Sequence, residues 1–93
     1  MAKLHHSGIA QETVLRQAEV IQRMMGDLER TVQILSIHIS TEEERVRIFD
    51  RSEPAYPILA RTLIARRDNL VVTLAALGKR LHAITAATVA VAA

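Results

Sequence analysis

Mostly apolar residues recur along the chain in alternating steps of four and three through two long stretches. The first series consists of Val14, Ala18, Ile21, Met25, Leu28, Val32, Leu35, Ile39, Glu42, Val46 and Phe49. The second consists of Tyr56, Ala60, Leu63, Arg67, Leu70, Leu74, Leu77, Leu81, Ile84, Thr88 and Val91. This spacing places the members of each series, called the seam below, on one face of a helix. It predicts two long amphipathic helices, at about 9–51 and 54–91, after a disordered segment at 1–7.

Both prolines of the chain, Pro54 and Pro57, fall between the two series. Proline lacks the amide donor that a helix interior needs, so we expect a turn at 52–56. Ser52 or Glu53 is expected to cap the second helix, with Pro54 in its first turn. Because a short connection makes helices antiparallel neighbours, the sequence predicts an all-α fold. The whole chain, 1–93, is expected to form one domain, a long antiparallel, coiled-coil-like helical hairpin.

Two features allow an interruption of the first helix or of the seam. Ser40 with Glu43, and Thr41 with Glu44, match capping-box patterns that can start a new helix. The heptad phase nevertheless passes through this segment unshifted, which favours a continuous helix. Gly26 and Gly78 lie off the seam and are interpreted as tolerated or close-approach positions, not helix ends.

Several apolar residues lie off the seam, where a single hairpin cannot bury them. They are Val20, Met24, Ile34, Ile37, Ile48, Ile64, Val71 and Val72. Apolar positions around most of a helix imply neighbours on more than one side. These residues are the predicted oligomer interface of a homodimeric four-helix bundle, since two-fold dimers are the commonest closed assembly. A tetramer is the alternative.

Charged residues interrupt the seam at Glu42 in the first helix and at Arg67 in the second. If the turn is centred near residue 54, Glu42 lies level with Arg66 or Arg67. We therefore predict an interhelical ion pair that sets the register.

Arginines recur every seven residues on the outward face of the first helix, at Arg16, Arg23 and Arg30. They are candidate contacts for nucleic acid, because arginine dominates phosphate recognition. Glu12 and Glu19 lie four residues before Arg16 and Arg23, an orientation that favours pairs within the helix. A solvated, self-paired face is the favoured interpretation.

Composition narrows the function classes. The 93 residues include no cysteine, and twelve basic and ten acidic side chains give a net charge of +2. Disulfides and thiol chemistry are excluded, and no strong field for nucleic acid follows. The sequence has no phosphate loop or nucleophile–base motif, and the order of His38 and Glu42 does not match carboxylate-bridged metal bundles. We expect a protein that is not an enzyme, binds no cofactor or metal, and is cytoplasmic without a membrane segment.

Three function classes remain, led by a homo-oligomeric adaptor, scaffold or small regulatory protein–protein interaction module. The second is a helical-hairpin dimer that binds RNA or DNA. Such a dimer is similar in architecture to the plasmid Rop protein, although no motif residues carry that resemblance. The third is a secreted or filament-forming hairpin, because Pro54-x-x-Pro57 resembles the turn of type III secretion needle subunits.

Overall fold

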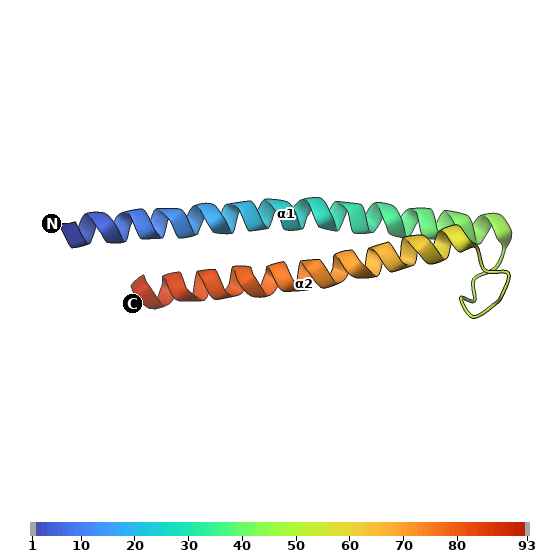
Figure 1. The fold of residues 1–93 in the computed structure, drawn as a ribbon. Coiled ribbons are helices and arrows are strands. Elements are labelled where there is room, and N and C mark those ends of the chain that lie inside the picture. Colours follow the sequence, from blue (N-terminus) through green and yellow to red (C-terminus); the bar gives the residue numbers. More distant parts are fainter. Residues whose placement is uncertain (1, 93) are drawn as a thin grey trace.

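The computed structural model of the chain contains two helices, α1 (Ala2–Val46) and α2 (Ile58–Ala92). The structure describes the backbone of residues 2–92 and the side chains of residues 10–87. The two helices lie side by side and antiparallel, and α1 extends beyond the C-terminal end of α2 (Figure 1). The predicted all-helical chain and its hairpin arrangement are confirmed, and the described residues contain no strand.

The hairpin is a thin rod. Its principal extents are 69 × 18 × 16 Å and its radius of gyration is 20.4 Å. A compact domain of this length would have a radius of gyration of about 12 Å. The chain therefore has one helix–helix interface along its length and no enclosed centre.

The small core lies on the predicted seam. The buried apolar side chains among the described residues are Ala18, Ile21, Leu35, Ile39, Tyr56 and Ala60. Every other seam residue within the helices whose side chain is described is half-buried. Thr88 and Val91, also assigned to the seam, lie outside the described side chains. Heptad spacing thus identified correctly the face that each helix turns towards the other.

Helix α1 is continuous through the Ser40–Glu44 segment, as the unshifted heptad phase predicted. The Thr41 hydroxyl donates to the Ile37 carbonyl oxygen at 2.9 Å, a bond within the helix instead of a cap. At its other end α1 begins at Ala2, so residues 2–7 are helical where disorder was expected. The physical reason is that extending an existing helix costs little once it is nucleated, and no proline blocks this stretch.

Both interior glycines are accommodated within helices, as expected. A β-carbon added to Gly78 would lie 3.7 Å from Cε of Met25, which is ordinary van der Waals contact. The same atom at Gly26 would lie 3.8 Å from a guanidinium nitrogen of Arg30. Gly78 therefore faces α1 across the interface, although neither glycine is required there by lack of space.

Helix α1 ends at Val46, five residues before the predicted end. Arg47 adopts a left-handed conformation with φ 60°, and its amide donates to the Glu43 carbonyl oxygen at 2.8 Å. This bond satisfies one of the last carbonyls, and the left-handed residue redirects the chain. Phe49, which was assigned to the seam, consequently lies in the connection and is 53% exposed.

The connection 47–57 is longer than the predicted turn and is built from successive hydrogen-bonded turns. The Asp50 carboxylate accepts the Ser52 hydroxyl at 2.7 Å and the Ser52 amide at 2.9 Å. Both hydrogen bonds lower the pKa of the Asp50 carboxyl, and the bond from the Ser52 hydroxyl has the larger effect. The Glu53 amide then donates to the Asp50 carbonyl oxygen, and the Tyr56 amide to the Glu53 carbonyl oxygen. Ser52 and Glu53 are therefore turn residues and do not cap α2.

Helix α2 begins at Ile58, so the prediction that Pro54 occupies its first turn is wrong. Pro57 takes the starting position instead, because its carbonyl oxygen accepts the first helical bond, from the Arg61 amide at 3.1 Å. A proline fits there because its missing donor has no partner at a helix start. The turns preceding it hold Pro54 outside the helix.

Tyr56 anchors the connection to the hairpin. Its side chain is 2% exposed, and its hydroxyl donates to a Glu43 carboxylate oxygen at 2.9 Å. The Arg61 guanidinium lies over the ring, 5.2 Å from its centre, and donates to the Glu53 carbonyl oxygen. One side chain thus joins the end of α1, the connection and the first turn of α2.

Replacing Tyr56 should destabilise the hairpin in two steps. We expect Tyr56→Phe to lower the free energy of unfolding by about 0.5–1.5 kcal/mol, because it removes one hydrogen bond. Tyr56→Ala should cost about 3–5 kcal/mol, because it also leaves a cavity. Urea denaturation followed by circular dichroism at one fixed protein concentration measures both. Phe49→Ala, in the same connection but exposed, is the control and should change little.

The burial of Tyr56 also leads us to expect that the stability of the hairpin depends on pH in the alkaline range. Burial, followed by the hydrogen bond to Glu43, raises the pKa of Tyr56 above its ordinary value. Its stabilising effect is therefore complete below about pH 10 and is lost as the pH rises through the folded-state pKa. The wild-type chain should unfold at a higher urea concentration than Tyr56→Phe, and this difference between their urea midpoints should narrow between about pH 9 and 11. A constant difference across that range would contradict the burial of a neutral phenol.

Candidate interaction surfaces

The register of the hairpin follows from contacts between its helices. The Arg67 guanidinium donates to the Ser36 hydroxyl at 3.1 Å, and Met25 lies opposite Gly78. These pairs place the midpoint of the hairpin near Arg51 and Ser52, not near residue 54. The early end of α1 accounts for this shift.

The predicted interhelical pair between Glu42 and Arg66 or Arg67 does not form. Glu42 instead accepts two hydrogen bonds from Arg45 on its own helix, at 2.9 and 3.2 Å. The Arg45 hydrogen bond lowers the pKa of Glu42. Arg67 bonds to Ser36, and Arg66 is exposed with no ion pair among the described side chains. The physical reason is the register, which places Arg67 level with Ser36, about six residues or ~9 Å along α1 from Glu42.

The predicted interface residues divide into exposed and half-buried groups. Six of the eight are about half exposed or more: Val20, Met24, Ile34, Ile37, Val71 and Val72. Ile48 and Ile64 are half-buried. Leu15, Ile58 and Leu59 are also more than half exposed. Sequence reasoning missed Leu15 and Leu59 as surface candidates, although both lie off the seam and the same test would have found them.

One flank of the hairpin carries an apolar groove where α1 meets α2. It has a volume of about 380 Å³ and is lined by Val20, Met24 and Leu77, together with Arg16 and Arg80. We call it the basic groove. A second hollow, of about 240 Å³, is lined by His38, Thr41 and Leu59, among others. His38 follows Met24 by two heptads, so both hollows lie on the same flank.

The opposite flank carries a different set of side chains. Leu15 is five residues from Val20, which places it about 140° away around α1. Glu12 and Glu19 lie three residues before and four residues after Leu15, on neighbouring parts of the surface. We call these three residues the acidic ridge. Leu15 is 57% exposed, so the ridge presents an apolar side chain between two carboxylates.

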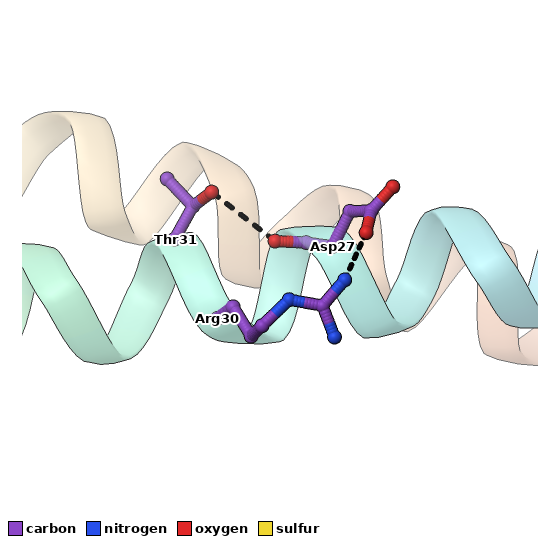
Figure 2. A network of polar contacts seen from close by, with 3 residues as sticks. All are labelled: Asp27, Arg30 and Thr31. Carbon is purple, nitrogen blue, oxygen red and sulfur yellow. Dashed lines mark hydrogen bonds and ion pairs between the residues drawn. The ribbon is translucent and has the colours of Figure 1, made fainter.

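The outward arginines of α1 are partly self-paired, as the favoured interpretation expected. Arg16 bonds to Glu12 at 3.4 Å, and Arg30 bonds to Asp27. Figure 2 shows Asp27 bonded to both Arg30 and Thr31, and the Thr31 hydroxyl donates to the Asp27 carbonyl oxygen at 3.1 Å. Arg23 has no ion pair among the described side chains, so the expected bond to Glu19 is not formed. These exposed pairs are worth little each, yet they occupy two of the three candidate phosphate contacts.

Helix α2 is apolar enough in composition to span a membrane, with a mean hydropathy of 1.3 over its most apolar window within Ile58–Ala87. The sequence prediction of no membrane segment considered only the C-terminal tail and did not anticipate this. Five of the six leucines of this stretch lie on the seam and are half-buried against α1, namely Leu63, Leu70, Leu74, Leu77 and Leu81. The sixth, Leu59, lies off the seam and is 52% exposed. Packing in the hairpin therefore provides one explanation for the apolar composition.

Comparisons with known proteins add no relative. No protein family, curated protein or solved structure matches this chain.

Arg67 occupies a seam position where an aliphatic residue would pack against α1. We expect Arg67→Leu to raise the free energy of unfolding by about 1 kcal/mol, because apolar burial replaces one polar contact. Arg66→Leu, at the exposed neighbouring position, is the control and should change it by less than about 0.5 kcal/mol. Urea denaturation at fixed concentration compares the two. A loss of more than about 1 kcal/mol in Arg67→Leu would show instead that the bond to Ser36 is needed for packing.

Proposed function

We propose that this chain is a non-enzymatic, homo-oligomeric helical-bundle protein that acts in the cytoplasm as an adaptor, scaffold or small regulatory protein–protein interaction module. Two hairpins that share their spare apolar surface would make a four-helix bundle, which is the smallest such assembly. The observation that carries the proposal is the row of half-exposed aliphatic side chains on both flanks of the hairpin.

The surface area of the single chain supports this proposal. The hairpin exposes 7026 Å². A compact monomer of the same mass would expose about 5,400 Å². The excess, about 1,600 Å², is roughly twice what one partner contributes to a standard protein–protein interface. Association would bring the exposed area of each chain towards that of an ordinary globular protein.

The free energy gained by burying these side chains also supports self-association. Burying one Ile, Leu or Val side chain contributes about 1.5–3 kcal/mol. Four of the exposed residues, such as Val20, Met24, Ile34 and Leu59, would contribute about 3–6 kcal/mol, because about half of each side chain is already buried in the hairpin. The cost of association is about 4–15 kcal/mol, so this gain matches the lower part of that range. Additional exposed residues, Val71 and Val72 among them, increase the gain further.

The chemistry of the described surface supports an adaptor role. Within the described side chains, no three residues of the His, Cys, Asp or Glu types gather as metal ligands. The basic groove has an aliphatic lining from Val20, Ile21, Met24 and Leu77, which suits the packing of another helix. The nucleic-acid alternative is less favoured, because Arg16 and Arg30 are paired with carboxylates of their own helix.

Sedimentation equilibrium tests the proposal. At micromolar concentration we expect the wild-type chain to have a mass above the 10.3 kDa of one chain. Ile34→Glu should raise the dissociation constant at least about tenfold, because a charge replaces an aliphatic group that the interface would bury. Gln33→Glu adds the same charge at a neighbouring exposed polar position and should leave the mass unchanged. A wild-type chain of 10.3 kDa at all concentrations would refute self-association.

A further inference from the structure

The two flanks of the hairpin differ in charge. On the side of the acidic ridge, α1 carries charged residues next to the seam between residues 12 and 43. All of these charged residues are acidic. These four residues are Glu12, Glu19, Glu29 and Glu43. On the side of the basic groove, α2 contributes Arg66 and Arg80, and Arg16 also lines the groove. Asp27, one heptad after Val20, also lies on this side, but its carboxylate is paired with Arg30. The part of each flank around Leu15 or Val20 therefore combines exposed apolar side chains with a different sign of charge.

We propose that copies of this hairpin bind one another through two different surfaces, the acidic ridge of one copy entering the basic groove of the next. Leu15 of one copy would pack on Val20 and Met24 of its neighbour. The glutamates on either side of Leu15 would face Arg16 and Arg80. This inference rests on the self-association proposed above and goes beyond it by naming which surfaces meet.

The spacing of the charges fits this arrangement. Glu12 and Glu19 are seven residues apart, which is about 10 Å along a helix. Arg80 lies two residues beyond Gly78, which faces Met25, so the antiparallel register places Arg80 level with Arg23. Arg16 and Arg80 are therefore also separated by about seven residues, or about 10 Å, along the rod.

The chemistry of the two surfaces is also complementary. The exposed side chain of Leu15 offers an apolar knob, and the groove is lined by Val20, Met24 and Leu77. The pair between Glu12 and Arg16 on one helix is exposed at both ends, so it can exchange for a pair between copies at little cost. Opposite charges at the rim favour this orientation and disfavour others.

A symmetric contact would lack this complementarity. Pairing groove with groove brings Arg16 and Arg80 of two copies together, and pairing ridge with ridge brings Glu12 and Glu19 together. Like charges at an interface are unfavourable. A contact between different surfaces instead leaves one ridge and one groove free on each pair of hairpins. Two hairpins still form a four-helix layer, but further copies add to it and produce a ring or an array. This differs from the two-fold dimer that the sequence predicted.

Two variants test the proposal by mixing. Leu15→Arg disables the ridge and Val20→Glu disables the groove, and both positions are more than half exposed in the hairpin. Each variant alone should associate at least about tenfold more weakly than wild type. An equimolar mixture should form a 1:1 dimer of about 21 kDa, twice the 10.3 kDa of one chain, because each variant retains the surface that the other lacks. Ala65→Glu, on the outer face of α2, is the control and should assemble like wild type.

The alternative outcomes separate the two proposals. If one variant is monomeric while the other keeps the wild-type mass, or if mixing restores nothing, the contact is not between ridge and groove. Self-association would then stand and this inference would fall. If the wild-type chain is itself monomeric, both fail. Circular dichroism of each variant should show wild-type helix content.

A charge exchange provides a second test that leaves the apolar side chains intact. Glu19→Arg and Arg80→Glu should each weaken association about fivefold at low salt. Mixing the two variants should restore it, because the exchanged charges again face each other. Light scattering at about 50 mM and 500 mM salt measures both effects, which should shrink at high salt. Association of the mixture no stronger than that of the single variants would overturn the proposal.

Discussion

One constraint dominates this chain, namely that two helices share one interface. Each helix can bury only the stripe that faces the other, and the buried side chains among the described residues are correspondingly few and all lie on the seam. The residues off the stripe have no internal neighbour to cover them. A third helix or a second copy would relieve this limit, and within the described residues the chain contributes only α1 and α2.

The ends of the helices determine how that single interface is aligned. The left-handed Arg47 ends α1, the Asp50 and Glu53 turns carry the chain round, and Tyr56 fastens the connection against Glu43. A connection of this kind constrains the relative position of the two helices, because hydrogen bonds join one of its ends to α1 and the other to α2. The Arg67 bond to Ser36 and the approach of Gly78 to Met25 are consequences of that alignment.

The two flanks left open by the hairpin are chemically unequal. Aliphatic side chains occur on both, so apolar burial alone would not decide which surface meets which. Charge supplies the distinction, since the ridge around Leu15 is acidic and the groove around Val20 contains Arg16 and Arg80. In a rod so thin, side chains one or two positions from the seam already belong to the outer surface. Their charge therefore governs how copies would meet.

Sequence alone determined the two helices, their antiparallel order and the buried stripe, because helical periodicity is local and the heptad from Val14 to Val46 is unbroken. It also identified Val20, Ile34 and Val72 as apolar residues that the hairpin leaves exposed. Only the tertiary structure decided where α1 ends and which residues face each other. Those features depend on Arg47 and on the contact of Tyr56 with Glu43, thirteen residues earlier. The partners of Glu42 and Arg67 followed from this register, which the seam pattern leaves free because a seven-residue repeat reads alike at every shift of one heptad.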